Sequence, residues 1–200
     1  MGKNSGGVRR EPRGDYKFKG KIEGVESIKN IKHADVYREV KSAISRYHAV
    51  LGVRQKEVKL ADLPDYVSGA HVTNEGKSQG VYLNKDLFNS RKSTIIDEKR
   101  LGYKTGWSTK TNKPIAHTVT HELAHATWNN ALKSPNARKA GKEISAVYKM
   151  WAKDKKKKGY GQYAKTSVNE FFSETITKGI HGKSDKYTRA LFEIVKKHKL

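Results

Sequence analysis

The sequence predicts a single α+β domain in which helices surround one small sheet. Apolar residues recur every three or four positions near both ends of the chain, which is the period of amphipathic helices. Between residues 53 and 107 the pattern shortens to alternating, β-branched and aromatic residues separated by Gly, Asn, Asp and Ser, which favours short strands. The length of 200 residues suits one domain with its own core and leaves residues for a tail.

The first 30 residues are expected to form a flexible basic arm ahead of a domain that spans residues 31–200. They are rich in Gly, Lys and Arg and contain few apolar side chains. Such a segment buries too little surface to offset the conformational entropy that ordering would remove.

The first predicted helix follows this arm and covers residues 35–51. Its apolar residues recur at helical spacing, and Gly52 follows it as a C-terminal cap. Short strands are expected at EVKL, residues 57–60, and within GVYLNKDLF, residues 80–88.

Two long helices are predicted in the middle of the chain. The first covers about residues 114–130, because apolar residues recur at helical spacing and Pro114 suits a first helical turn. The second covers about residues 137–153 and has an apolar side of the same period.

Two more helices are predicted near the C-terminus. One begins near Val168, because Ser167 and Glu170 have the S-x-x-E spacing of a capping box ahead of an apolar run. The other is capped by Ser184 and continues through Val195, and a basic KKHKL end favours its C-terminal dipole.

The helix predicted over residues 114–130 contains three histidines at intervals of four residues: His117, His121 and His125. Residues four apart on an α-helix differ by about 40° in angle and about 6 Å in rise. His121 and His125 therefore project from one face and can hold one metal ion. Glu122 lies about 100° round from His121, beside the ion, where it can accept a proton from water.

A third ligand is expected elsewhere, because catalytic zinc usually has three protein ligands and one open position. The chain contains no cysteine, so a metal must bind nitrogen and oxygen. NEFFSE, residues 169–174, has two carboxylates one helical turn apart. Glu170 is the predicted zinc ligand, and Glu174 is predicted to accept the second ring N–H of a ligand histidine. The alternatives are two solvated surface acids beside a capping box, and a divalent ion other than zinc.

His117 is predicted not to be a metal ligand. It lies in the first helical turn, where exposed N–H dipoles disfavour its protonation, and a fourth protein ligand would displace the catalytic water. Two alternatives stay open for His117. It lines the cleft or supports a ligand, or it is a structural histidine at the start of the helix.

The pairing of HELAH, residues 121–125, with NEFFSE resembles the gluzincin metallopeptidases, in which the third zinc ligand is such a glutamate. The likeness is closer to the catalytic domain of anthrax lethal factor and to zincin-like domains found with phage head proteins. In those domains an EFFAE-like helix follows a Tyr-Ala segment, and YAKTSVNEFFSE is similar to it. Ser173 stands where the family favours Ala. The likeness covers roughly residues 80–185 and is specific at these two motifs.

This resemblance implies a zincin-like metallopeptidase fold: a small sheet, an active-site helix that carries HELAH, and a C-terminal helical part that supplies the third ligand. It implies that Tyr163 donates a hydrogen bond to the oxyanion of the tetrahedral intermediate, or a proton to the leaving amine. The alternative for Tyr163 is an aromatic that anchors a loop, with Tyr160 as its rival. The resemblance also implies a substrate bound as an extended strand, beside residues 80–83.

The function expected from these motifs is that of a zinc-dependent endopeptidase, which hydrolyses a protein or peptide with Glu122 as general base. A toxin, an effector and a phage-encoded protease are the contexts considered. The alternative is a phage structural or nucleic-acid-associated protein whose zincin-like fold has incidental or lost peptidase activity.

The net charge of +22 and the pI near 10.0 favour anionic partners. Nucleic acid or another polyanion is expected to bind the basic arm and the run of Lys155, Lys156, Lys157 and Lys158, and the alternative is a solvated loop. Neither a membrane span nor a signal peptide is expected. A cytoplasmic location, a place in a virion and export by a non-classical route all stay open.

Overall fold

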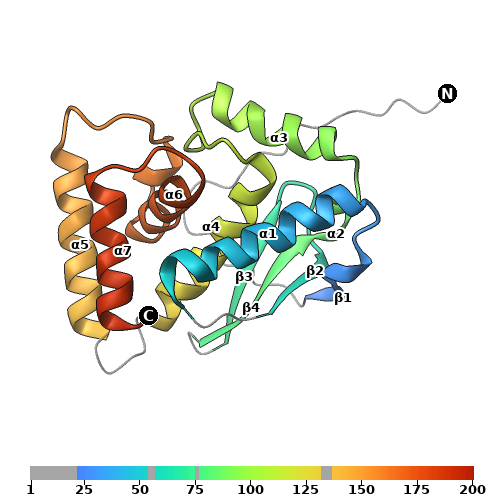
Figure 1. Ribbon diagram of the computed structural model, residues 1–200, viewed down its shortest axis with the longest axis horizontal. Helices are drawn as coiled ribbons and strands as arrows, with labels where there is room; N and C mark the ends of the chain where they lie inside the picture. The colour runs from blue at the N-terminus through green and yellow to red at the C-terminus, as the bar shows by residue number, and fades with distance from the viewer. Residues whose placement is uncertain (1–21, 54–56, 75–76, 132–136) are drawn as a thin grey trace.

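A computed structural model describes residues 22–53, 57–74, 77–131 and 137–200 (Figure 1). It is an α+β structure with one four-stranded sheet, which confirms the predicted class. In Figure 1 the sheet lies at one end of the molecule and the last three helices lie at the other. Among the described residues, no helix combines the length and the apolar character that crossing a membrane requires.

The sheet has the strand order β1-β2-β4-β3. β2 (Val58–Asp62) is parallel to β4 (Lys77–Asn84) and antiparallel to β1 (Glu23–Ser27). β3 (Gly69–Asn74) pairs with β4 in the antiparallel sense. In the described part of the chain, β3 is therefore an edge strand and β4 is internal.

The predicted end of the flexible arm, at residue 30, lies too far along the chain. Glu23–Ser27 forms strand β1 and Ile28–Asn30 forms the short 3-10 helix η1, whereas residues 1–21 lie outside the described residues. Four of the five β1 residues are exposed, so the strand has no apolar pattern that sequence reading can detect. Its order comes from backbone pairing with β2, which is a non-local interaction.

Helix α1 (Ala34–Leu51) forms as predicted and buries the apolar side of its stripe. Val40, Tyr47 and Leu51 are buried in the main core. Gly52 ends the helix in the left-handed region at φ 67°, and its N–H donates to the carbonyl of His48. A glycine adopts this conformation without steric strain.

The region between residues 80 and 107 contains two helices that were not predicted. The KDLF part of the predicted strand is the short helix α2 (Lys85–Phe88), because the Asn84 side chain accepts a hydrogen bond from the N–H of Leu87 and ends the strand. Helix α3 (Lys92–Lys104) buries only Ile95 and Lys99, so its apolar periodicity is weak.

Four helices complete the fold and match the predicted positions closely. They are α4 (Pro114–Ala131), α5 (Ala137–Lys153), α6 (Val168–His181) and α7 (Lys186–His198). α4 contacts α1, α3, α6 and strands β3 and β4, so it lies at the centre of the molecule. The cap of the last helix differs from the prediction, because Asp185 and not Ser184 accepts the N–H groups of the first turn.

Candidate metal centre

The two predicted motifs meet where helices α4 and α6 pack against each other. His121 and His125 lie on α4, and Glu170 lies in the first turn of α6. The hydroxyl of Ser167 accepts a hydrogen bond from the N–H of Glu170 at 3.1 Å, as predicted for the helix cap. This cap fixes where α6 begins and therefore where the Glu170 carboxylate lies.

Three side-chain atoms converge between these helices. Oε2 of Glu170 lies 3.0 Å from Nε2 of His121 and 3.3 Å from Nε2 of His125. The two Nε2 atoms lie 3.0 Å from each other. Two ligands bound to zinc at about 2.0–2.1 Å in tetrahedral geometry would lie about 3.3 Å apart. The three residues therefore have the spacing of a metal site.

The far sides of both rings face acceptors, which determine where the ring protons lie. Nδ1 of His121 lies 3.1 Å from Oε1 of Glu174. Nδ1 of His125 lies 2.8 Å from Oδ1 of Asn169 and 3.0 Å from the hydroxyl of Ser173. Acceptors this close favour a proton on each Nδ1, so when a cation binds, each Nε2 can supply a lone pair to it. The contact of His121 Nδ1 with Glu174 is an ion-pair contact without hydrogen-bond geometry.

The point where the Glu170 carboxylate meets the two Nε2 atoms is electron-rich and buried. Oε2 of Glu170 has no hydrogen-bond partner within the described residues, and all three side chains are buried. Burial opposes charge on both histidines, but the carboxylates outweigh it and raise the pKa of His121 and His125. Burial likewise opposes ionisation of Glu170, but His125 and His121 lower its pKa to about 2. Lone pairs and electrostatics together fit a cation held by these three residues.

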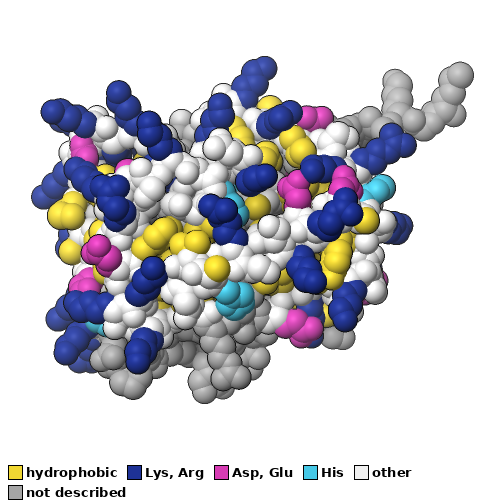
Figure 2. All heavy atoms as spheres, viewed as in Figure 1, with side chains coloured by type: hydrophobic (Ala, Val, Ile, Leu, Met, Phe, Trp, Pro, Cys, Tyr) yellow, Lys and Arg dark blue, Asp and Glu magenta, His cyan; other side chains and the backbone are white. Residues whose placement is uncertain are grey.

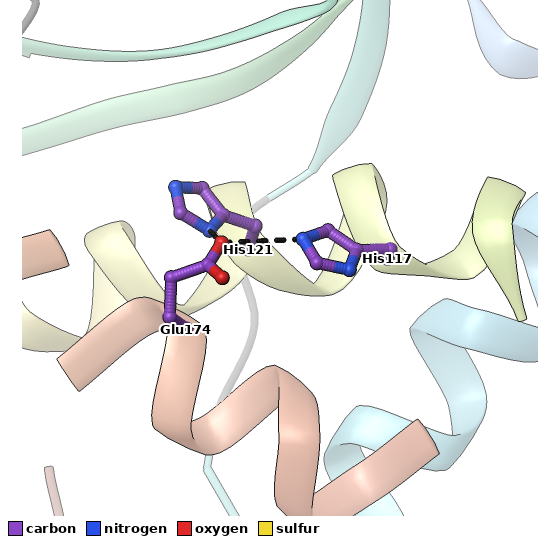
Figure 3. A group of neighbouring side chains, drawn as sticks. All are labelled: His117, His121 and Glu174. Carbon is purple, nitrogen blue, oxygen red and sulfur yellow. Dashed lines mark hydrogen bonds and ion pairs between the residues drawn. The ribbon is translucent and has the colours of Figure 1, made fainter. Parts of the chain in front are cut away.

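Glu174 forms a second buried cluster behind His121, which Figure 3 shows. Its Oε1 lies between Nδ1 of His121, at 3.1 Å, and Nε2 of His117, at 3.2 Å. Its Oε2 accepts a hydrogen bond from the backbone N–H of Thr109 at 2.7 Å. Glu174 thus has the contacts expected of a residue that orients a ligand histidine.

His117 supports this carboxylate and is fully buried, so it does not line a cleft. The hydroxyl of Tyr103 lies 3.1 Å from its Nδ1. Burial, together with the charge of Lys99, lowers the pKa of His117 to about 4. A neutral ring that donates from Nε2 to Glu174 and accepts at Nδ1 satisfies both nitrogens.

His117, His121 and Glu174 also have ligand atoms within 4.8 Å of one another, so they are a second group with the spacing of a metal site. Hydrogen bonds already account for the ring nitrogens of His117 and for both oxygens of Glu174. The group of His121, His125 and Glu170 is the better fit, because its three potential ligand atoms face one another and Oε2 of Glu170 has no hydrogen-bond partner within the described residues.

Glu122 is in neither group of potential ligands. Its side chain is partly exposed and lies against the edge strand β3. A Cβ atom added at Gly69 of that strand would lie only 2.8 Å from Cγ of Glu122. The glycine therefore allows the strand to approach the side chain of Glu122 closely.

The structure brings Tyr163, and not Tyr160, next to the candidate metal ligand His121. The ring of Tyr163 stacks on the ring of His121, with centroids 5.6 Å apart and planes inclined by 16°. Tyr160 instead donates its hydroxyl proton to Asp185 and packs beside Trp151. The stacking on His121 does not test the catalytic role of Tyr163, which stays a prediction.

Gly161 positions both Tyr163 and Glu174 by letting two backbone segments touch. The N–H of Tyr163 donates to the carbonyl of Trp107 at 2.9 Å, and the N–H of Gly161 donates to the hydroxyl of Thr109 at 3.0 Å. Thr109 in turn binds Glu174. A Cβ atom added at Gly161 would lie 2.2 Å from the Trp107 carbonyl oxygen, which is far too close for the backbone to stay in place.

Replacing Gly161 by alanine is therefore expected to destabilise the fold by at least about 2 kcal/mol, because the clash is with backbone atoms that cannot rotate away. Urea unfolding of the metal-free chain measures the change. Gly102→Ala is the matched control, since its Cβ would meet only the side chain of Ser108, at 3.1 Å from the hydroxyl, and alanine favours helix α3. Equal unfolding midpoints for Gly161→Ala and the wild type would contradict the assignment.

Sequence reading missed two residues beside His125. The ring of His71, on β3, stacks near the ring of His125 with centroids 6.5 Å apart. Nδ2 of Asn129 donates to the carbonyl of His125 and lies 3.1 Å from Nδ1 of His71. Asn129 follows His125 by one helical turn, which is a detectable signal. His71 reaches the site only through the pairing of β3, which no local pattern reveals.

The prediction that the substrate lies beside residues 80–83 is wrong. Residues 80–83 belong to β4, and Val81, Tyr82 and Leu83 pair with both β2 and β3, so this part of the strand has no free edge. The edge strand beside α4 is β3. The prediction failed because β3 itself was not recognised as a strand.

Comparisons with known proteins identify no family, since no family model, curated protein or solved structure matches the chain. The resemblance to gluzincins and to the lethal-factor catalytic domain therefore rests on the two motifs alone.

Proposed function

We propose that the protein is a zinc-dependent endopeptidase with a zincin-like fold. The observation that carries this proposal is the convergence of Nε2 of His121, Nε2 of His125 and Oε2 of Glu170, which lie 3.0 to 3.3 Å from one another. Glu122 stands beside this group as a carboxylate that does not belong to it. Three ligands and a separate base are the set that hydrolysis at a metal requires.

Zinc is the ion that we propose, because the candidate ligands are two imidazoles and one carboxylate whose atoms lie 3.0 to 3.3 Å apart, close to the separation at a tetrahedral zinc. Other divalent ions also bind two histidines and a carboxylate, so the ion is chosen on spacing and on the chemistry proposed. When bound, zinc would lower the pKa of a water molecule and polarise the substrate carbonyl.

Residues of the chain would perform the proton transfers, stabilise the developing charge and orient the ligands. Glu122 accepts a proton from water and returns it to the leaving amine. Tyr163 donates a hydrogen bond to the oxygen that gains charge during attack on the carbonyl. Glu174 holds the Nδ1 proton of His121 and so keeps its Nε2 directed toward the ion.

The substrate is proposed to bind as an extended peptide along β3. This strand pairs only with β4 within the described residues, and helix α4 lies next to it. A peptide that added a strand at this edge would lie close to Glu122, because Gly69 brings the strand against that side chain. A toxin, an effector or a phage-encoded protease would all use this arrangement.

Metal removal and replacement test the proposal. The purified chain is expected to contain about one zinc per molecule, since one group of three ligands fits the ion. It should cleave members of a diverse quenched-peptide library, lose cleavage after chelation and regain it with added zinc but not with magnesium. A zinc-loaded chain that cleaves no peptide would contradict the endopeptidase proposal and favour the alternative, a structural or nucleic-acid-associated protein with lost activity.

A further inference from the structure

The outer face of α5 carries four basic residues that the proposed peptidase site does not use. They are Arg138, Lys142, Lys149 and Lys153, all exposed, and we call them the α5 basic row. Figure 1 places α5 at the end of the molecule farthest from the sheet. Dark blue side chains gather along the same edge in Figure 2.

The row lies opposite the buried side of the helix. Ala140, Ile144, Val147 and Trp151 are buried in the core, and α5 packs against α6 and α7. At about 100° per residue, the centre of the row lies about 180° from the centre of these four residues. The row therefore points straight out into solvent.

The row is also straight, and all four of its side chains are positively charged. Its members follow one another at intervals of four, seven and four residues, and small Ser145 and Ala146 fill the wider interval. At 1.5 Å per residue the row is about 22 Å long. No acidic residue of α5 lies within it, since Glu143 lies well to one side of the row.

The acidic side chains near the row form ion pairs with other residues. Glu143 binds Lys197 at 2.8 Å, and Asp154 binds Lys186 at 3.0 Å, so both carboxylates face α7. Across residues 22–53, 57–74, 77–131 and 137–200, no acidic side chain pairs with the row. Its positive charges are therefore available to an external anion.

We propose that the α5 basic row binds the phosphate backbone of double-stranded nucleic acid without sequence preference. Duplex DNA presents about one negative charge per 1.7 Å of its axis, so a straight row of cations meets several phosphates at once. An anionic membrane fits less well, because a helix at a membrane surface inserts an apolar face. The apolar face of α5 is packed inside the protein, and Met150 is the one large hydrophobic residue exposed on the described α5.

The lysine run after α5 extends this surface only in part. Lys157 donates to the carbonyl oxygens of Ala152 and Asp154 and lies over the Trp151 ring, so it stabilises the end of the helix. Lys155, Lys156 and Lys158 are exposed. Three of the four predicted lysines are thus free to continue the row.

Duplex binding by the full chain tests the proposal, with the anisotropy of a labelled DNA of mixed sequence as the readout. The row variant is Lys142→Gln/Lys149→Gln/Lys153→Gln. The control is Lys32→Gln/Lys41→Gln/Lys104→Gln, which removes the same charge from exposed lysines elsewhere. The row variant is expected to bind about tenfold more weakly, with a salt slope smaller by about 2 to 3, because each phosphate contact contributes about 0.9. The control slope should change by less than about 1.

Three results would overturn the proposal. One is absence of duplex binding by the wild type, and another is an equal loss in both variants, which would show that net charge alone is responsible. The third is row-dependent binding to phosphatidylserine vesicles with unchanged duplex binding. Circular dichroism checks that both variants are folded. The readout is independent of peptide hydrolysis, so failure of the proposed peptidase function leaves this test intact.

Discussion

Glu122→Gln is expected to abolish peptide hydrolysis while the chain keeps its zinc. Glutamine has nearly the shape of glutamate, but its amide does not accept a proton from water at neutral pH. A general base contributes typically 10²- to 10⁴-fold, so kcat should fall by about three orders of magnitude. Metal content should not change, because Glu122 belongs to neither group of potential ligands. Peptide cleavage and metal analysis on the same sample measure both effects.

Glu193→Gln is the matched control for this variant. It makes the same chemical change at an exposed position on α7, far along the chain from both motifs. Its activity and zinc content should equal those of the wild type. Two outcomes would contradict the role of Glu122 as base. The first is Glu122→Gln activity within a few-fold of wild type, and the second is loss of zinc together with activity.

The helices and the candidate metal ligands could be predicted from the sequence because both depend on local spacing. His121 and His125 share a helix face through an interval of four residues, and a cap formed by Ser167 marks the start of the helix that holds Glu170. The packing of α4 on α6 was not evident from either pattern. It was inferred from the need for a third ligand and from the resemblance to gluzincins, and the structure brings the three side chains together.

The residues that support the candidate ligands could not be predicted from the sequence, because their positions depend on contacts between distant segments. Thr109 reaches Glu174 only because Gly161 lets two backbone segments touch, and Tyr103 reaches His117 from a helix with a weak apolar pattern. His71 depends on the pairing of an edge strand. Lone glycines and short polar strands have many possible roles, and only the assembled fold selects among them.

Glu170→Gln is expected to weaken zinc binding more than Glu174→Gln does. Both changes neutralise a buried carboxylate on the same face of α6, one turn apart, so they form a matched pair. Loss of a residue that supports a ligand typically lowers metal affinity by about 10- to 100-fold, and loss of a ligand should exceed that. Competition with a chromophoric chelator at neutral pH measures both affinities.

The same pair decides which of the two buried groups holds the ion. If His121, His125 and Glu170 hold it, His117→Gln should behave like Glu174→Gln, because both residues act through His121. If His117, His121 and Glu174 hold it, Glu174→Gln and His117→Gln should lose zinc and Glu170→Gln should keep it. Unfolding of each metal-free variant in urea separates loss of a ligand from loss of the fold. Retention of full zinc affinity by Glu170→Gln would remove the basis for hydrolysis at this site, since the ion would then lie among His117, His121 and Glu174 and not among the three residues proposed as its ligands.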